Sequence, residues 1–147
     1  MKITLCGSIS FYDEMLKVKK ELEKMGHEVK LPPTEIKNKE GKMIPVSEYY
    51  LLRKKETSEN SWIWDRKAEL IKIHYKKEEW CDVLLVTNYD KNGIKGYIGG
   101  NTLIEMGVAF YLDKPIYLLN QIPEISYKEE ILGMRVIAIN GDLKAIK

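Results

Sequence analysis

The sequence predicts an α/β protein built from βαβ units around an open parallel sheet. Apolar runs of strand length alternate with segments in which apolar residues recur at helical spacing, as such units require. The chain has 147 residues, 44% of them hydrophobic, which is enough to bury one core. No internal repeat and no sign of a second domain interrupts the pattern. We therefore expect a single domain over residues 1–147.

The expected elements follow one another in strict alternation at both ends of the chain. Ser10 marks the start of the first helix and Gly26 its end. The helix before the third strand is expected to carry Leu70, Ile73 and Lys77 on one stripe. Strands are expected at 2–6, 27–31, 82–87, 115–119 and 135–139, and helices at about 10–25, 66–80, 101–112 and 126–132, with a last helical turn after residue 141.

Residues 34–65, after the second strand, do not follow this alternation. Charged residues, Gly41, Pro45, Trp62 and Trp64 succeed one another there without a sustained period. A connector in such a fold usually has about 4–6 residues. We therefore interpret this segment as an insertion, either a mobile flap over a site or a partly helical excursion.

The charge composition argues against nucleic acid and membranes as partners. Lys and Arg number 24 against 22 Asp and Glu, and the net charge is only +2. The arginines are Arg53, Arg66 and Arg135 alone, too few for a site of several guanidinium groups. No apolar run approaches the roughly 18 residues that span a bilayer, and no signal peptide is evident. The expected location is cytoplasmic.

The two cysteines suggest neither a disulfide nor a metal site. Cys6 ends one predicted strand and Cys81 precedes another, so their sulfur atoms should lie on the order of 15 Å apart. His27 and His74 are far apart in sequence, and no Cys-x-x-Cys pair is present. We expect two free thiols, no metal and no cofactor.

A ligand site is expected beyond the carboxyl ends of the strands, where open parallel sheets bind ligands. Gly7 and Ser8 offer backbone amides there for an anion or a sugar, although a tight turn needs the same residues. Asn88 and Asn120 end two strands, and Asn is equally common in turns. The candidate substrate-binding residues are Gly7, Ser8, Ile9, Asn88, Gly99, Gly100, Asn101, Thr102 and Asn120.

Glu105 is the principal candidate for chemistry. It follows the paired glycines of the segment 99–107 and lies in the expected first turn of a helix. With Thr102 three residues before it, Glu105 fits a capping box, which would explain it completely. A carboxylate facing the crevice from this position could instead attack or stabilise an electron-poor carbon.

These segments resemble the nucleoside 2-deoxyribosyltransferase family, whose superfamily includes 2'-deoxynucleoside 5'-phosphate N-hydrolases. The resemblance rests on Cys-Gly-Ser-Ile at 6–9, Trp-Cys-Asp-Val-Leu-Leu-Val at 80–86, Gly-Gly-Asn-Thr-x-x-Glu-x-Gly at 99–107 and Lys-Pro-Ile-Tyr at 114–117. It covers most of the chain apart from residues 34–65.

The resemblance implies a flavodoxin-like or Rossmann-like fold, with five parallel strands in the order 2-1-3-4-5 and helices on both faces. It implies cleavage of an N-glycosidic bond, or deoxyribosyl transfer, on a small nucleoside or nucleotide. Glu105 matches the family's nucleophile, which attacks the anomeric carbon and forms a glycosyl-enzyme intermediate. Family members assemble as homodimers or higher oligomers, so a homo-oligomer is expected here.

The residue that would protonate the leaving base departs from the family pattern. Where transferases commonly have Asp-Ser-Gly-Thr, this chain has Gly-Gly-Asn-Thr at 99–102. A second family aspartate is replaced by His74, which could donate a proton or be an ordinary surface residue. Asp90 is a further catalytic candidate, although its segment also has the composition of a turn.

Three features leave the substrate and the activity open. Trp62 and Trp64 could stack a nucleobase or lie in a subunit interface. No Arg lies near Gly7 and Ser8, which disfavours a tightly held 5'-phosphate unless the insertion supplies the clamp. The alternative to an enzyme is a non-catalytic nucleotide or nucleotide-sugar sensor, and a third possibility is an oligomerising protein with a vestigial crevice.

Overall fold

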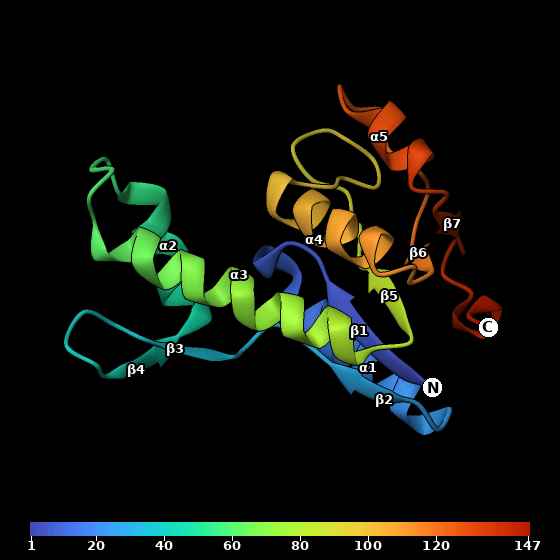
Figure 1. The fold of residues 1–147 in the computed structure, drawn as a ribbon, viewed down its shortest axis with the longest axis horizontal. Coiled ribbons are helices and arrows are strands. Elements are labelled where there is room, and N and C mark those ends of the chain that lie inside the picture. The colour runs from blue at the N-terminus through green and yellow to red at the C-terminus, as the bar shows by residue number, and fades with distance from the viewer.

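A five-stranded parallel sheet forms the centre of the protein in the computed structural model, which describes all residues 1–147 (Figure 1). The sheet consists of β1 (Lys2–Cys6), β2 (Glu28–Lys30), β5 (Val83–Val86), β6 (Ile116–Leu118) and β7 (Ile137–Ala138). The strands lie in the order β2-β1-β5-β6-β7, and each neighbouring pair is parallel. Counted along the chain this is the order 2-1-3-4-5, so the predicted sheet is confirmed. Every strand except β1 is shorter than predicted at both ends.

Helices cover both faces of the sheet, as predicted. On one face, α1 (Tyr12–Lys24) and the 3₁₀ turn η2 (Leu143–Ala145) pack against strand residues such as Ile3 and Leu5. On the other face, α4 (Gly100–Tyr111) and α5 (Lys128–Gly133) pack against strand residues such as Cys6 and Leu84. Because successive side chains of a strand point to opposite faces, each apolar run contributes to both cores.

The insertion after β2 is folded rather than irregular. It contains the antiparallel hairpin of β3 (Glu35–Lys37) and β4 (Met43–Pro45), followed by α2 (Val46–Lys55). Ile36, Ile44, Tyr49 and Ile63 form a separate small core, in which the Tyr49 hydroxyl donates to the Ile63 carbonyl at 2.7 Å. This part lies to one side of the sheet, at the far end of the long helix α3 (Trp62–Trp80) (Figure 1). Of the two interpretations of this segment, the partly helical excursion agrees with the structure.

Helix α3 begins earlier and buries a different face than predicted. Its start at Trp62 is capped by Ser61, whose side chain accepts a hydrogen bond from the Ile63 amide at 3.2 Å. Ile73, predicted on the buried stripe, is 47% exposed, while His74 and Glu78 are buried. Since α3 contacts both β1 and α4, its neighbours decide which face is covered, and that face is partly polar.

Helix α4 begins at Gly100, with Gly99 as a cap that offers no side chain. The predicted capping of this helix by Asn101 or Thr102 is therefore wrong. Thr102 is buried within the first turn, and Glu105 lies in the second turn. The first helix also differs from its prediction, because the 3₁₀ turn η1 (Ile9–Phe11), capped by Ser8, precedes α1.

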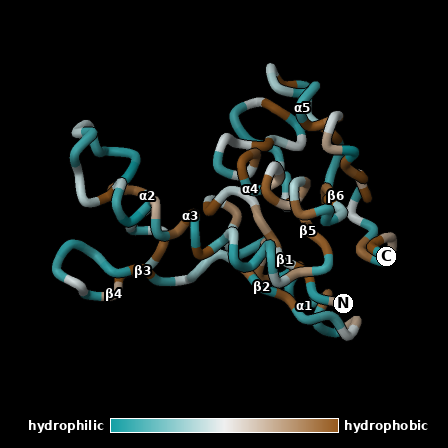
Figure 2. The backbone as a smooth tube through the Cα atoms, in the orientation of Figure 1, coloured by the Kyte–Doolittle hydropathy of each residue, from teal (hydrophilic) through white to brown (hydrophobic).

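Apolar residues concentrate in the sheet, whereas the loop between β3 and β4 and much of α2 are hydrophilic (Figure 2). None of the helices combines the length and apolar character that crossing a bilayer requires. Cys6 and Cys81 are both buried and unpaired, which confirms the prediction of two free thiols.

Candidate active site

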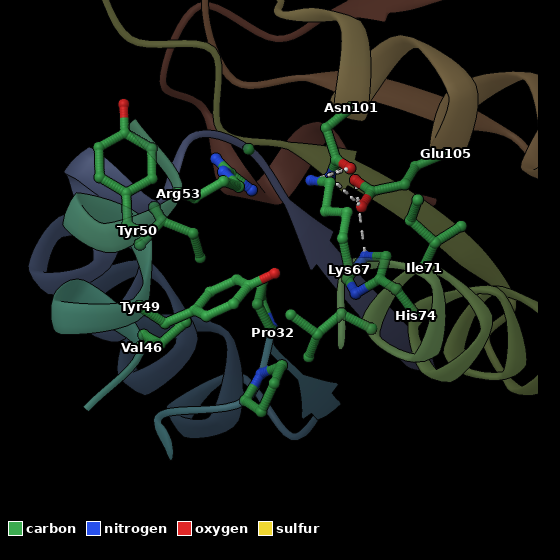
Figure 3. Close-up of a pocket in the computed structure, with 14 residues that line it drawn as sticks. Pro32, Val46, Tyr49, Tyr50, Arg53, Lys67, Ile71, His74, Asn101 and Glu105 are labelled. Carbon is green, nitrogen blue, oxygen red and sulfur yellow. Dashed lines mark hydrogen bonds and ion pairs between the residues drawn. The ribbon is translucent and has the colours of Figure 1, made fainter. Parts of the chain in front are cut away.

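A pocket of about 560 Å³, including its open mouth, lies between the end of β1, the insertion and the facing sides of α3 and α4. Its wall combines apolar and charged side chains (Figure 3). Ionisable residues come from three helices: Arg53 from α2, Lys67 and His74 from α3, and Glu105 from α4. Tyr49 and Tyr50 are its aromatic lining residues. The pocket meets the sheet at Gly7, the end where ligands of open parallel sheets bind.

Glu105 is directed toward this pocket rather than back to its own helix end. It is 5% exposed, and its Oε1 accepts a hydrogen bond from the Asn101 side-chain amide at 2.8 Å. The Lys67 ammonium donates to Asn101 Oδ1, also at 2.8 Å, so the three residues form a chain (Figure 3). Burial raises the pKa of Glu105 to about 8, while the charge of Lys67 acts in the opposite direction.

Lys67 is a second ionisable group whose proton affinity is changed by the site. Burial, together with the neighbouring charge of Arg53, lowers its pKa to about 8, although the charge of Glu105 acts against this shift. Its ammonium therefore has a pKa close to that of the carboxyl group to which Asn101 connects it. A group of this kind can both stabilise a carboxylate and release a proton near neutral pH.

His74 lies beside Glu105, with 3.7 Å between His74 Nε2 and Glu105 Oε2. Burial lowers the pKa of His74 to about 4, and the charge of Lys77 contributes to the shift. Its imidazole is therefore neutral at physiological pH. The structure brings this predicted catalytic residue into the pocket but does not give it the proton that a general acid needs at pH 7.

The predicted glycine turn after β1 has a steric reason. Gly7 has a φ of +154°, and a Cβ atom at this position would lie 2.4 Å from Thr87 Oγ1. Only glycine therefore allows the loop to pass so close to the end of β5. Ile9 lies with Gly7 on the wall of the pocket, and Ser8 lies on the wall of an adjoining cavity.

This adjoining cavity is rich in cationic groups. Its walls include Arg53 and Lys54 from α2, Lys91 from the loop after β5, and the start of α4. The Lys91 ammonium lies 2.9 Å from Ser8 Oγ and 3.4 Å from the Tyr50 hydroxyl. None of the three cations takes part in a salt bridge. The remaining predicted binding residues at this cavity are Gly99, Gly100, Asn101 and Thr102.

Three of the predicted site residues instead connect loops to one another. The Asp90 carboxylate accepts from the Gly96 amide at 2.9 Å, which is turn chemistry. Asn88 donates to the Gln121 carbonyl at 2.8 Å and accepts from the Asn120 amide at the same distance. Asp90, Asn88 and Asn120 do not line either cavity.

The tryptophans of the insertion also remain outside both cavities. Trp62 packs on Tyr49 with ring centroids 6.2 Å apart, and the exposed Trp64 donates from its indole to the Ser58 carbonyl at 2.8 Å. Tyr49 and Tyr50, rather than the two tryptophans, are the aromatic residues that line the pocket. Sequence analysis did not identify Lys67 or Lys91 as site residues, and no local motif marks them.

No protein-family model matches this chain, and no curated protein matches it in sequence. Among solved structures it is similar to the CMP N-glycosidase BcmB of Clostridium botulinum. The two share 19% identity and a TM-score of 0.51, over 95% of this chain and 90% of that one. It is also similar to a 2-deoxyribosyltransferase of the psychrotolerant bacterium Bacillus psychrosaccharolyticus, with 21% identity and a TM-score of 0.45, over 80% of this chain and 71% of that one.

The likeness to the CMP N-glycosidase extends over nearly the whole of both chains. At this level of identity it establishes a shared α/β fold of Rossmann type, which is the fold that the resemblance implied.

Proposed function

We propose that this protein is an enzyme that cleaves the N-glycosidic bond of a nucleoside or nucleotide, with Glu105 as the nucleophile. The observation that carries this proposal is the position of the Glu105 carboxylate. It is buried at the wall of a pocket, and it accepts a hydrogen bond from the side chain of Asn101, in the first turn of the same helix, rather than from a backbone amide of the helix end. The two structural neighbours, a glycosidase and a deoxyribosyltransferase, support the same class of reaction.

In the proposed first step, an oxygen of ionised Glu105 attacks the anomeric carbon while the bond from that carbon to the base nitrogen breaks. The bonding electrons leave with the base, which takes up a proton, and a glycosyl ester of Glu105 remains. Water then attacks the same carbon and releases the sugar and the carboxylate, or the nitrogen of a second base does so in a transfer reaction. The developing positive charge on the sugar favours a carboxylate at this position.

Lys67 is the group that we propose as the proton source for the departing base. It carries a proton at pH 7 and lines the pocket, and its pKa of about 8 lies in the range that general acids use. Its charge also favours ionised Glu105. His74, neutral in this environment, is proposed to contact the substrate as an imidazole rather than to donate as an imidazolium.

The adjoining cavity supports a nucleoside 5'-monophosphate as the substrate. Arg53, Lys54 and Lys91 are cations without acidic partners, and the start of α4 presents free backbone amides beside them. Because Arg53 lines both cavities, a phosphate there would leave the sugar and base within reach of Glu105. Arg53 belongs to the insertion, the segment from which any phosphate clamp was expected.

The test is incubation with a panel of deoxynucleosides, ribonucleosides and their 5'-monophosphates, with chromatographic detection of free base. We expect base release by the natural protein, and a loss of more than about 1,000-fold in Glu105→Gln. Glu129→Gln, on the exposed face of α5, is the matched control. Full turnover by Glu105→Gln would overturn the assignment of the nucleophile. Nucleotide binding without base release would favour the sensor function, and no binding at all would favour a vestigial crevice.

A further inference from the structure

A cluster of buried polar side chains lies behind the pocket, where α3 meets α4. His74 and Glu78 lie one turn apart on α3, and Glu105 reaches them from α4; their exposed fractions are 4%, 0% and 5%. His74 Nε2 lies 3.7 Å from Glu105 Oε2 and 3.9 Å from Glu78 Oε1. One potential ligand atom of each residue lies within 4.8 Å of those of the other two.

Three side-chain polar atoms of this cluster are buried without a hydrogen-bond partner. Both carboxylate oxygens of Glu78 and the Nε2 atom of His74 are buried and unpartnered. The two lysines nearby are engaged elsewhere, since Lys67 donates to Asn101 and Lys77 to the Leu31 carbonyl. Buried polar groups normally have partners, because leaving them unpaired is unfavourable. The cluster therefore lacks an electropositive partner at its centre.

The geometry points to a binding site for a divalent transition-metal ion of the zinc type, formed by His74, Glu78 and Glu105. Metal bonds of about 2.0–2.2 Å place neighbouring ligands of a tetrahedral site roughly 3.4 Å apart. The observed 3.7 and 3.9 Å require only small side-chain movements to reach this spacing. A doubly charged ion would also neutralise the two carboxylates, neither of which forms a direct ion pair with a lysine or arginine.

The donor set selects the class of metal. One imidazole nitrogen and two carboxylates suit Zn²⁺, Co²⁺ or Mn²⁺, whereas Ca²⁺ and Mg²⁺ favour six or more oxygen ligands. Three protein ligands leave a fourth position for water. Because His74 and Glu105 both line the pocket, this position and the route of entry lie on the pocket side.

A metal at this site would inhibit the proposed cleavage of the N-glycosidic bond. This part of the inference rests on the proposed function. An ion bound to Glu105 Oε2 would neutralise the negative charge of the carboxylate and draw electron density from both of its oxygens, which weakens it as a nucleophile toward the anomeric carbon. Metal loading therefore inhibits cleavage, and removal of the metal restores it. The metal acts here as an inhibitor that competes for the nucleophile, not as a cofactor.

The test is titration of chelator-treated protein with Co²⁺ alone, followed by visible absorption, and with Zn²⁺ by calorimetry. We expect one ion per chain, with absorption bands of low-coordinate Co²⁺. Loss of outer-shell partners alone weakens metal sites by about 10- to 100-fold, so we expect Glu78→Gln to weaken binding by more than about 100-fold. Glu79→Gln, the exposed neighbour on the same helix, should bind as the natural protein does.

Two results would overturn the metal site: natural protein that binds Co²⁺ no better than Glu78→Gln does, or equal loss in Glu79→Gln. If Glu78→Gln fails to fold by circular dichroism, Glu105→Gln serves in the same titration. In the activity assay, Zn²⁺ should inhibit the natural protein reversibly and leave Glu78→Gln active. Since the Co²⁺ titration needs no substrate, absence of base release refutes the proposed function alone, and absence of Co²⁺ binding refutes the metal site alone.

Discussion

The Asn101 side-chain amide donates to Glu105 Oε1 across 2.8 Å, one turn along α4. This contact shows that Glu105 does not cap its helix, because its carboxylate accepts from the side chain of Asn101 in the first turn and not from a backbone amide of the helix start. Asn101 in turn accepts from Lys67, whose position on α3 is 34 residues away in sequence. Asn101 therefore connects the Lys67 ammonium to the Glu105 carboxylate through two hydrogen bonds, without a direct ion pair between them.

Replacing Lys67 should change both the rate and the pH dependence of base release. The natural protein should show a bell-shaped profile of kcat/KM centred near pH 8, because Glu105 must be ionised and Lys67 protonated. Lys67→Met should lower the rate by about 10²- to 10⁴-fold. It should also move the rising limb to higher pH, since the charge of Lys67 lowers the Glu105 pKa. An unchanged rising limb in Lys67→Met would contradict the electrostatic influence of Lys67 on Glu105.

Replacing Arg53 should weaken the binding of nucleoside 5'-monophosphates and leave the binding of nucleosides nearly unchanged. A hydrogen bond to a charged group contributes about 1.5–3 kcal/mol, so Arg53→Met should raise KM for a 5'-monophosphate by roughly 10- to 100-fold. KM for the corresponding nucleoside should change little. Lys55→Met, an exposed substitution on the same helix, provides the control for a general loss of positive charge. Equal effects on both substrates would argue against the phosphate subsite.

Glu78 should make the stability of the protein fall as pH rises. Burial, and then the charge of Glu105, raises its pKa from 4.5 to about 9 in the folded chain. Between these values the folded state holds a proton that the unfolded state releases, so stability decreases with increasing pH. With a chelator present, Glu78→Gln should melt within about 2 °C of the natural protein at pH 5 and several degrees above it at pH 8.5. Thermal melts at both pH values measure this difference, with Glu79→Gln as the control. If Glu78 were ionised throughout, the melting temperatures of Glu78→Gln and the natural protein would differ by the same amount at both pH values.

Asp90 should contribute to loop stability and not to catalysis. Asp90→Asn keeps an acceptor for the Gly96 amide, so we expect base release within about twofold of the natural rate. Asp90→Ala leaves that buried amide unpaired and should destabilise the fold by about 1–3 kcal/mol in denaturant titrations. A 100-fold slower reaction in Asp90→Asn with unchanged stability would restore Asp90 as a catalytic residue.

Several features of the site could be predicted from local sequence. Gly7 could be predicted because a strand-to-helix turn at this edge of the sheet needs a residue without Cβ. Glu105 could be selected because its segment resembles a known motif. The start of α4 was mispredicted, since Thr102 and Glu105 fit a capping box equally well, and only the position of Gly99 as the cap separates the two possibilities.

Other features depend on contacts between residues far apart in the chain. The prediction of no metal considered only Cys and His spacing, and it had no way to place Glu78 beside Glu105, 27 residues later. Ile73 was expected in the core from its spacing, yet α3 presents His74 and Glu78 to its neighbours instead. Helical periodicity predicts that a face exists, but the packing partner decides which face is buried.

The sequence by itself predicted a parallel sheet built from βαβ units, because strand-length apolar runs alternate with helical segments, and the resemblance of its motifs to a known family implied the strand order and the two helical layers. It also placed a carboxylate near the ligand-binding edge. Only the tertiary structure decided the pKa of that carboxyl group, because it depends on burial and on Lys67, Cys6 and Asn101 around it. Those surroundings arise where α3, α4 and the end of β1 meet, and no local pattern encodes the distances between them.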